Sequence, residues 1–469
     1  MAIFRIRQAV DTRPWPKFRI PVAAGKEWYG RRARVKAAGI ATSLLFASGL
    51  LIASCASAKH PPAPRPAPAP SSVVAVVDAG APPPDEIATD ELEPLLRNDS
   101  EIAALIDEGG RRRLQVLAAF PTRTKDGRLV LHRSALRLDA EYFYPASSVK
   151  LFAAYAAIEK LDDMSEELTV PVSTTTPIRF VTGEGRSRQV VTTTLRRDLE
   201  QALIVSDNDA HDRLFDFVGR EELAERLARI GLKRTILVQH LGKAAKARVA
   251  APPLIDLLVP PEPPVSVSHR LGFEVPTSPW AGVRLGRAYV DERGKVVQGP
   301  MDFSTKNATS LRDLQDVLIA ITRPELFDRL PSGTLHSPAA RPEVVEILAK
   351  LPSELEGSRR GRPTAKDAFQ KPLQVGLTAA FPEEKVRVYG KGGRAYGFTV
   401  ENAYIVSERT GRGFFLASTL YANDNDTLND DGYEYLSVGT PFLARLGVIL
   451  ARKVFREAES PFTRPDAGR

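Results

Sequence analysis

The sequence predicts an α/β domain whose antiparallel sheet is built from both ends of the chain. Two strand-like segments, 113–121 and 128–143, stand near the start of the folded region. Residues 384–423 alternate like three further strands, and the segments between the two groups have helical periodicity. We therefore expect the two groups of strands to pair in one sheet that helices flank, with an all-helical part between them.

The elements of the first half follow in order. Residues 90–109 are typical of a helix that ends near its two glycines. The polar stretch 124–128 predicts a hairpin turn between the first two strands. Residues 149–161 are apolar on nearly every side, so they should form a buried helix. The start of this helix, at 145–147, presents backbone N–H groups that favour negative charge.

The second half continues with helices and closes with strands and a helix. A helix is expected from about Thr194 to Val205, followed by a polar turn, a second helix and an amphipathic helix that ends near Leu232. Further helices are predicted at 310–330, with Ser310 as N-cap, and at 341–351. After the three strands, an apolar helix over 439–458 ends the folded region.

The composition describes an ordinary globular protein with a basic leader. Apolar residues make up 43% of the chain and charged residues 26%. The formal charge of +8 comes from residues 1–55, which hold ten Lys and Arg against two acids. The remaining residues, 56–469, hold 55 basic and 55 acidic side chains. The excess charge therefore belongs to a targeting segment and does not indicate nucleic-acid binding.

Residues 1–55 have the layout of a secretion signal. Four basic residues precede an uncharged stretch of 18 residues, 37–54, and the only cysteine, Cys55, follows it. The ending "IASC" resembles the bacterial lipoprotein cleavage box, in which the cysteine is lipidated. We therefore expect an exported lipoprotein of the cell envelope that faces the periplasm. An uncleaved anchor is the alternative, because 18 residues just suffice to span a bilayer.

The rest of the chain divides into a spacer, one domain and a short tail. Residues 56–84 are rich in proline and alanine and form a linker rather than a fold. The domain extends over 85–459, and residues 460–469 form a disordered tail. A single cysteine excludes an intrachain disulfide, so the domain must be stable through its core. A signal does not need the 30 residues before Arg31, and a later start, for example at Val35, is an alternative.

Three short motifs stand on these elements in a specific order. Ser147-x-x-Lys150 opens the buried helix, Ser206-Asp207-Asn208 forms the polar turn, and Lys391-Gly392-Gly393 lies between two strands. The first motif alone recurs by chance, but the ordered set in these local structures is specific. The chain resembles the penicillin-recognising serine enzymes, and most closely the class A β-lactamases, from about Glu91 to about Glu457.

The spacing of the first motif explains why a lysine lies in a buried helix. Residues three apart share a helix face, and a serine hydroxyl needs a neighbouring base to become a nucleophile. Burial and nearby cations lower the pKa of a lysine, so that Lys150 can accept a proton. We predict Ser147 as the nucleophile, because Ser148 points about 100° around the helix. The Ser147 N–H at the helix start can form half of an oxyanion hole.

The resemblance implies a β-lactamase/transpeptidase-like fold, an acyl-enzyme and the remaining roles. Ser206 would relay protons to the leaving nitrogen, and Asn208 would hold the substrate amide and the lysine of the first motif. Lys391 would complement a substrate carboxylate, the Arg394 N–H would complete the oxyanion hole, and Gly393 would contact the substrate. No metal or cofactor is expected. The expected partners are a β-lactam or a peptidoglycan-derived small molecule, and the membrane through the lipid anchor, with the chain itself a monomer.

Two departures from the family pattern concern substrate binding and deacylation. Gly392 stands where the family carries a hydroxyl residue, which removes a hydrogen bond worth about 1.5–3 kcal/mol to a charged acceptor, and Arg394 could compensate. The family's glutamate in an E-x-x-L-N context is also missing. The acids between Gly242 and Phe303, none of them in that context, are Asp256, Glu262, Glu274, Asp291, Glu292 and Asp302. Acylation should therefore proceed while deacylation stalls.

Three functions remain open at this point. The first is a serine β-lactamase, the second a cell-wall DD-peptidase or related hydrolase on the same fold, and the third a non-catalytic penicillin- or peptidoglycan-binding lipoprotein. Two weaker features do not indicate metal binding. The acidic stretch 423–434 fails the EF-hand spacing and is expected to be a solvated turn, and the six histidines show no ligand spacing, with His211 expected on a helix surface.

Overall fold

The computed structural model describes most of the predicted domain. The described residues are 87–123, 129–168, 170–242, 252–273, 280–327, 341–355 and 364–456. They all belong to one compact unit. The predicted signal with Cys55, the linker 56–84, the tail 460–469 and the hairpin turn 124–128 lie outside the described residues.

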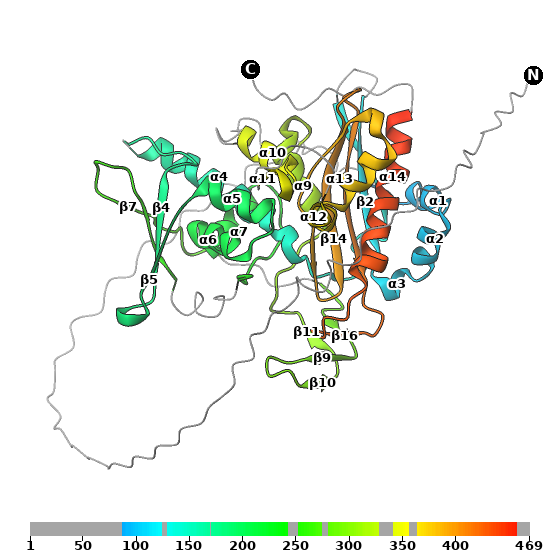
Figure 1. Cartoon of the computed structure of the whole chain (residues 1–469), viewed down its shortest axis with the longest axis horizontal. Coiled ribbons are helices and arrows are strands. Elements are labelled where there is room, and N and C mark those ends of the chain that lie inside the picture. The colour runs from blue at the N-terminus through cyan, green and yellow to red at the C-terminus, as the bar shows by residue number, and fades with distance from the viewer. Residues whose placement is uncertain are drawn as a thin grey trace, which may run out of the picture. The chain divides into compact units, whose positions relative to one another are not determined.

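A mixed seven-stranded sheet is built from both ends of the chain, as predicted (Figure 1). Its strands are β1 (Ile87–Ala88), β2 (Gln115–Arg123), β3 (Leu129–Leu136), β12 (Val386–Gly390), β13 (Gly393–Ala395), β14 (Phe398–Ser407) and β15 (Gly413–Tyr421). Their order is β1-β3-β2-β15-β14-β12, and β13 pairs with β14. Every ladder is antiparallel except the two-residue pairing of β1 with β3, which is parallel. The predicted strand 128–143 ends early, because Arg137 and Asp139 adopt left-handed backbone angles.

Helices cover both faces of this sheet. One face packs against α1 (Leu92–Leu96), α2 (Ser100–Asp107), α13 (Pro372–Ala380) and α14 (Thr440–Arg456). The other face packs against α4 (Lys150–Glu167) and α9 (Leu311–Thr322). Successive residues of the central strand β15 therefore point to opposite faces. Leu416 belongs to the core with α13 and α14, and Phe415 belongs to the core with α4 and α9. Ser310 caps α9 as predicted, by accepting a hydrogen bond from Asp313 N.

The predicted helix over 90–109 is divided into three short helices. Besides α1 and α2, the segment continues into α3 (Gly109–Arg112). The division falls at Asp99, whose carboxylate accepts hydrogen bonds from the backbone N–H groups of Glu101 and Ile102 and so starts α2. An aspartate that caps a new helix competes with continuation of the preceding one.

The part between the two groups of strands is helical but not all-helical. Its further helices are α5 (Leu195–Leu203), α6 (Asn208–Val218), α7 (Arg220–Arg229), α10 (Arg341–Ala349), α11 (Pro352–Leu355) and α12 (Ala365–Gln370). A four-stranded sheet in the order β5-β4-β6-β7 stands beside them, made of β4 (Pro177–Thr182), β5 (Gln189–Thr194), β6 (Leu254–Leu257) and β7 (Val265–Ser266). Val and Thr dominate the β4–β5 hairpin, and such β-branched residues favour strands.

The long interval between α7 and α9 adds further short strands. They are β8 (Arg284–Leu285), β9 (Ala288–Val290), β10 (Val296–Gln298) and β11 (Met301–Asp302), and β9 also pairs with β16 (Thr427–Leu428). The interval 242–303 is called the long insertion below, and its strand β9 pairs with β16, which follows the second group of strands in the sequence. None of the described helices combines the length and the apolar character that crossing a bilayer requires.

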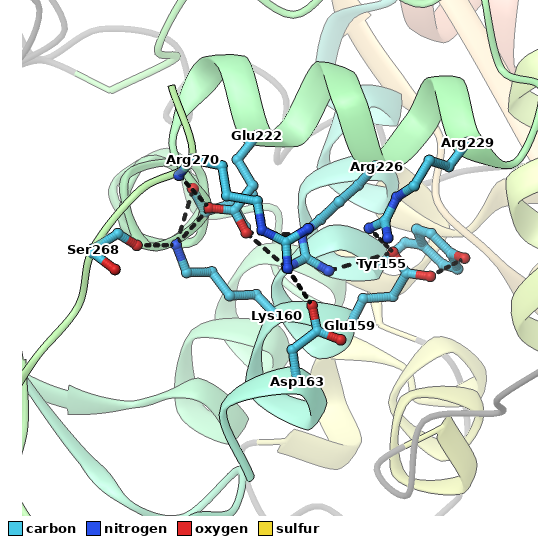
Figure 2. A network of polar contacts seen from close by, with 10 residues as sticks. Tyr155, Glu159, Lys160, Asp163, Glu222, Arg226, Arg229, Ser268 and Arg270 are labelled. Carbon is cyan, nitrogen blue, oxygen red and sulfur yellow. Dashed lines mark hydrogen bonds and ion pairs between the residues drawn. The ribbon is translucent and has the colours of Figure 1, made fainter. Parts of the chain in front are cut away.

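A buried ionic network ties α4 and α7 to the segment that follows β7 (Figure 2). Lys160 Nζ donates to Glu222 Oε2 at 2.8 Å and to the Ser268 carbonyl at 2.6 Å. The other Glu222 oxygen accepts from Arg226 Nη2 at 2.7 Å, and the Arg270 N–H donates to Glu222 Oε2 at 3.1 Å. Because each charge has an opposite partner, the network holds α4, which carries the first motif, in a fixed position against its neighbours.

Candidate active site

The first motif lies where a short 3-10 turn, Ala146–Val149, leads into α4. Ser147 is partly exposed, whereas Ser148 is fully buried and its Oγ donates to the Pro145 carbonyl at 2.6 Å. Only the first of the two serines is therefore accessible to a substrate. This arrangement agrees with the spacing argument that selected Ser147.

Lys150 brings the first and second motifs together. Its Nζ donates to the Ser206 carbonyl at 2.6 Å and to Asn208 Oδ1 at 2.7 Å. The hydroxyl oxygens of Ser206 and Ser147 lie 3.1 and 3.2 Å from the same nitrogen. The ammonium thus stands between the two hydroxyls, and the acceptors that hold it are neutral oxygens.

The electrostatic surroundings disfavour the charged form of Lys150. The side chain is fully buried, and burial is the main cause that moves its pKa well below the ordinary value. The positive charge of Lys391 lowers this pKa further, while Asp207 and Asp212 act in the opposite direction. The sequence argument that burial and a second cation neutralise this lysine is consistent with these surroundings.

The second motif forms a tight connection between α5 and α6. Asp207 caps α6 by accepting a hydrogen bond from Ala210 N at 2.7 Å. Ser206 has a left-handed φ of +65°, and two other non-glycine residues at this site share this conformation, Ala146 at +50° and Tyr396 at +52°. Such conformations cost about 1–3 kcal/mol each and cluster at functional sites, where the surroundings enforce them.

The third motif approaches Ser147 through β13. A side chain at Gly393 would collide with the Ser147 backbone nitrogen, so only glycine allows this approach. Ala395 and Phe398 close the two-residue turn between β13 and β14, which makes the next pair, Arg394 and Thr399, a non-hydrogen-bonded one. The Arg394 N–H therefore points away from β14, and β13 contacts the turn that holds Ser147.

Lys391 is buried at the end of β12 and its Nζ donates to the Gly392 carbonyl at 2.7 Å. Burial lowers its pKa to about 7, with Lys371 adding to the effect and Glu401 opposing it. The group therefore changes charge close to neutral pH, unlike an ordinary lysine.

The absent hydroxyl at Gly392 has a steric reason. A Cβ atom there would lie 2.6 Å from the Val400 carbonyl oxygen and 3.0 Å from Glu401 Oε1. The close approach of β14 thus excludes a serine or threonine from this backbone. The Arg394 guanidinium, which was expected to compensate, stacks 4.5 Å from the Phe369 ring centre and donates to Thr440 Oγ1 at 3.3 Å.

The acids considered for deacylation are held at other places. Asp256 on β6 pairs with Arg179 at 2.8 Å. Asp291 accepts from Arg293 N at 2.9 Å in the β9–β10 turn, and Asp302 accepts from Ser304 N at 2.8 Å. Of the remaining three acids, Glu262 and Glu292 are exposed and Glu274 lies outside the described residues.

Asp212 is a buried acid of the site that the sequence argument did not select. Its two carboxylate oxygens accept hydrogen bonds from Leu241 N at 2.7 Å and Gly242 N at 2.9 Å, so it holds the start of the long insertion against α6. It lies four residues after Asn208, on the same face of α6. This spacing was the signal that could have identified it.

The expectation of a surface position for His211 is wrong. Its side chain is only 1% exposed, because α6 contacts α4, α5 and α7 and so has little free surface. Burial and the nearby charge of Lys150 lower the pKa of this histidine well below its ordinary value. His211 therefore stays neutral behind the second motif.

The acidic stretch 423–434 contains β16 and a turn closed by its own side chains. Asp430 accepts from the side-chain amide of Asn425 at 2.7 Å and from Gly432 N at 2.9 Å. Across the described ranges, no group of three or more His, Cys, Asp or Glu residues is arranged to hold a metal ion.

A protein-family model and several solved structures match the chain. Residues 136–437 match the model of the β-lactamase enzyme family. Similar solved structures include the β-lactamases from Sphaerobacter thermophilus (14% identity, TM-score 0.41, covering 76% of this chain and 96% of that one) and Desulfarculus baarsii (17%, 0.42, 76% and 97%). An ancestral class A β-lactamase is also similar (18%, 0.42, 76% and 99%). No curated protein matches the sequence.

The family match covers all three motifs and well over half of the chain. It begins at the last residue of β3 and spans the helical part that carries the second motif and the strands β12 to β15. The chain belongs to the β-lactamase enzyme family.

Proposed function

We propose that this chain is a serine hydrolase of the β-lactamase family that is acylated at Ser147 by β-lactams and releases the product slowly. One observation carries the proposal. Lys150 Nζ lies 3.2 Å from Ser147 Oγ, in a buried position that depresses the pKa of the lysine. A weakly nucleophilic hydroxyl therefore has a base within hydrogen-bond distance.

The hydrogen bonds of Lys150 suit a neutral amine. A neutral amine has two N–H donors and one lone pair. The Ser206 carbonyl and Asn208 Oδ1, at 2.6 and 2.7 Å, accept the two N–H groups. The lone pair is then available to the Ser147 hydroxyl. Attack of Ser147 Oγ on the lactam carbonyl forms the acyl bond and transfers the hydroxyl proton to Lys150.

The other residues complete this reaction. Breaking the lactam C–N bond requires a proton for the leaving nitrogen, and the Ser206 hydroxyl, 3.1 Å from Lys150 Nζ, can deliver it while the lysine replaces it. The backbone N–H groups of Ser147 and Arg394 stabilise the tetrahedral oxyanion. Asn208 binds the substrate amide, and Lys391 in its charged form binds the substrate carboxylate, with Gly393 keeping the strand close to the nucleophile.

Slow release follows from the placement of the acids in the described residues. Water needs a general base to hydrolyse the acyl-enzyme, and Asp256, Asp291 and Asp302 are engaged in other contacts. Asp212, a buried acid whose charge acts on Lys150, accepts hydrogen bonds from the backbone N–H groups of Leu241 and Gly242 with its two oxygens. Because these acids are engaged in other contacts, the second candidate is a DD-peptidase or a penicillin-binding protein that a lactam inactivates.

The proposal is tested by labelling with a fluorescent penicillin and timing its release. The wild-type chain should form a covalent adduct that mass spectrometry locates at Ser147. Ser147→Ala and Lys150→Ala should abolish labelling, and Ser148→Ala is the matched control, because that hydroxyl is bound to Pro145. Labelling that persists in Ser147→Ala refutes the nucleophile, and no labelling of a folded wild-type protein favours a non-catalytic binder.

We further propose that the enzyme acts outside the cytoplasm as a monomeric lipoprotein attached through Cys55. The basic segment, the uncharged stretch and the cysteine support this assignment. A periplasm-facing position would give the site access to β-lactams and to peptidoglycan fragments.

A further inference from the structure

An aromatic cluster lies at the edge of the active site and includes residues from both sides of the long insertion. Tyr144 precedes the nucleophile by three residues, and its ring centre lies 4.9 Å from that of Tyr396, which follows the third motif. Phe303, at the end of the insertion, contacts both rings edge to face, with centres 5.8 and 5.1 Å away. The insertion therefore packs against residues that adjoin the first and third motifs in the sequence.

The position of Tyr396 is fixed by an unusual turn. Ala395 and Phe398 pair across the β13–β14 hairpin, so Tyr396 and Gly397 form a two-residue turn. Their φ angles are +52° and +83°, as a type I′ turn requires. A tyrosine is strained in this conformation, and the strain indicates that its ring position is enforced by the surroundings. The Gly397 N–H donates to Tyr435 Oη at 2.8 Å, which holds the turn in place.

Lys306 lies over two rings of this cluster. Its Nζ is 5.6 Å from the ring centre of Phe303 and 5.4 Å from that of Tyr396, within the range of cation–π attraction. The backbone on either side is well held, since Lys306 N donates to the Phe303 carbonyl at 3.0 Å. The side-chain oxygen of Asn307 also accepts from Val238 N and Gln239 N at 2.8 and 2.9 Å.

The Lys306 ammonium has no acidic partner within the described ranges. The side chain is half-buried, and burial lowers its pKa without an opposing contribution from a described carboxylate. Lys160, by contrast, is paired with Glu222 at 2.8 Å. A half-buried cation beside an active site, held by aromatic rings and lacking a counter-ion, is suited to receive an anion from the substrate.

We propose that Lys306 determines specificity by binding a second carboxylate of the acyl donor, on the part of the substrate that is remote from the scissile amide. The inference rests on the proposed function, because it assigns a substrate group to the same site. Tyr396 lies three residues beyond Gly393, which is about 10 Å along an extended strand. This carboxylate is therefore distinct from the one assigned to Lys391, and substrates with two carboxylates are preferred.

The experiment compares two penicillins that differ in one charge. Carbenicillin is benzylpenicillin with an added side-chain carboxylate, so the ratio of their acylation rate constants measures recognition of that group. We expect Lys306→Gln to lower the constant for carbenicillin about five- to tenfold, as for a partly exposed charged hydrogen bond, and that for benzylpenicillin less than twofold. Lys306→Arg should keep most of the preference. An equal loss for both penicillins in a folded variant, or an unchanged ratio, overturns the assignment.

A binding measurement separates this inference from the proposed function. Ser147→Ala cannot be acylated, so calorimetric titration with each penicillin reports recognition without chemistry. Ser147→Ala should bind carbenicillin about five- to tenfold more tightly than the double variant with Lys306→Gln, and the two should bind benzylpenicillin alike. If the wild-type protein is not labelled but this difference is found, the hydrolase proposal fails and the anion site stands. If labelling occurs and the difference is absent, the anion site fails alone.

Discussion

The buried lysines predict a bell-shaped pH dependence of acylation. Lys150 must be neutral to accept the Ser147 proton, and its pKa is depressed by burial and by Lys391. Acylation therefore rises as pH increases through the pKa of Lys150. Lys391 must be charged to bind the substrate carboxylate, and its pKa is about 7. Binding is therefore complete below this pH and is lost as pH rises above it.

The size of the alkaline decrease follows from the same value. One pH unit above its pKa, about a tenth of the Lys391 side chains remain charged, which corresponds to about 1.4 kcal/mol. Half of the side chains are charged at pH 7, so the acylation constant for benzylpenicillin should fall about fivefold between pH 7 and pH 8. A hydrogen bond to a charged group contributes about 1.5–3 kcal/mol. The total decrease in the acylation constant at high pH should therefore not exceed about 10- to 150-fold.

Stopped-flow acylation between pH 5 and pH 9 measures both limbs. Lys391→Arg is the matched variant, because a guanidinium stays charged over the whole range. The alkaline limb should disappear in this variant while the acid limb remains. A wild-type profile that is flat from pH 6 to pH 9, or an alkaline limb that persists in Lys391→Arg, would refute the assignment of these limbs.

The remaining predictions concern turnover, the anchor, the third motif and stability. With nitrocefin we expect a burst followed by turnover about 10²–10⁴-fold slower than in an enzyme with a positioned base, and rapid steady turnover without a burst would show that one of the acids of the insertion is the base. Cys55→Ala should leave an unprocessed precursor, whereas a cleaved, freely soluble Cys55→Ala protein would contradict the lipoprotein. Gly392→Ser should not improve substrate binding and should lower the free energy of unfolding by about 1–3 kcal/mol, as measured by urea denaturation; tighter binding with unchanged stability would contradict the steric argument. Lys160→Met should lower that free energy by about 3–5 kcal/mol because it leaves Glu222 with one cation fewer, while Lys150→Met should leave it unchanged or raise it; equal losses would contradict the distinction between the two lysines.

Much of the fold could be predicted because it depends on local pattern. The strands of the main sheet are short, mostly apolar segments between turns, and the run after Ser147 is apolar on nearly every side, as a helix between the sheet and other helices must be. The position of Lys150 three residues after Ser147 follows from helix geometry alone. The hydrogen bonds to Ser206 and Asn208 required the resemblance to a known family, because the two segments are far apart in the sequence.

The features that could not be predicted depend on tertiary contacts. His211 has the sequence environment of a surface residue and becomes buried only because three helices surround α6. Lys306 lies about 160 residues from the nucleophile, and no local pattern indicates that it contacts Tyr396. The conformation of Tyr396 was equally hidden, because tyrosine is a poor match for a turn that requires a positive φ.

The two buried lysines of α4 show how the same helix supports both structure and chemistry. Burial lowers the pKa of Lys160, and its ion pair with the buried Glu222 carboxylate opposes this effect. Lys150 lies ten residues earlier, about 15 Å along the helix axis, and is held by a carbonyl, an amide oxygen and hydroxyls, with a second lysine nearby. Pairing Lys150 with a carboxylate would stabilise its charged form and keep it protonated at neutral pH, so that it could not accept a further proton. None of the described carboxylates forms an ion pair with Lys150, which lowers the stability of the fold but keeps the pKa of this lysine low. The low pKa is what allows Lys150 to accept a proton from Ser147.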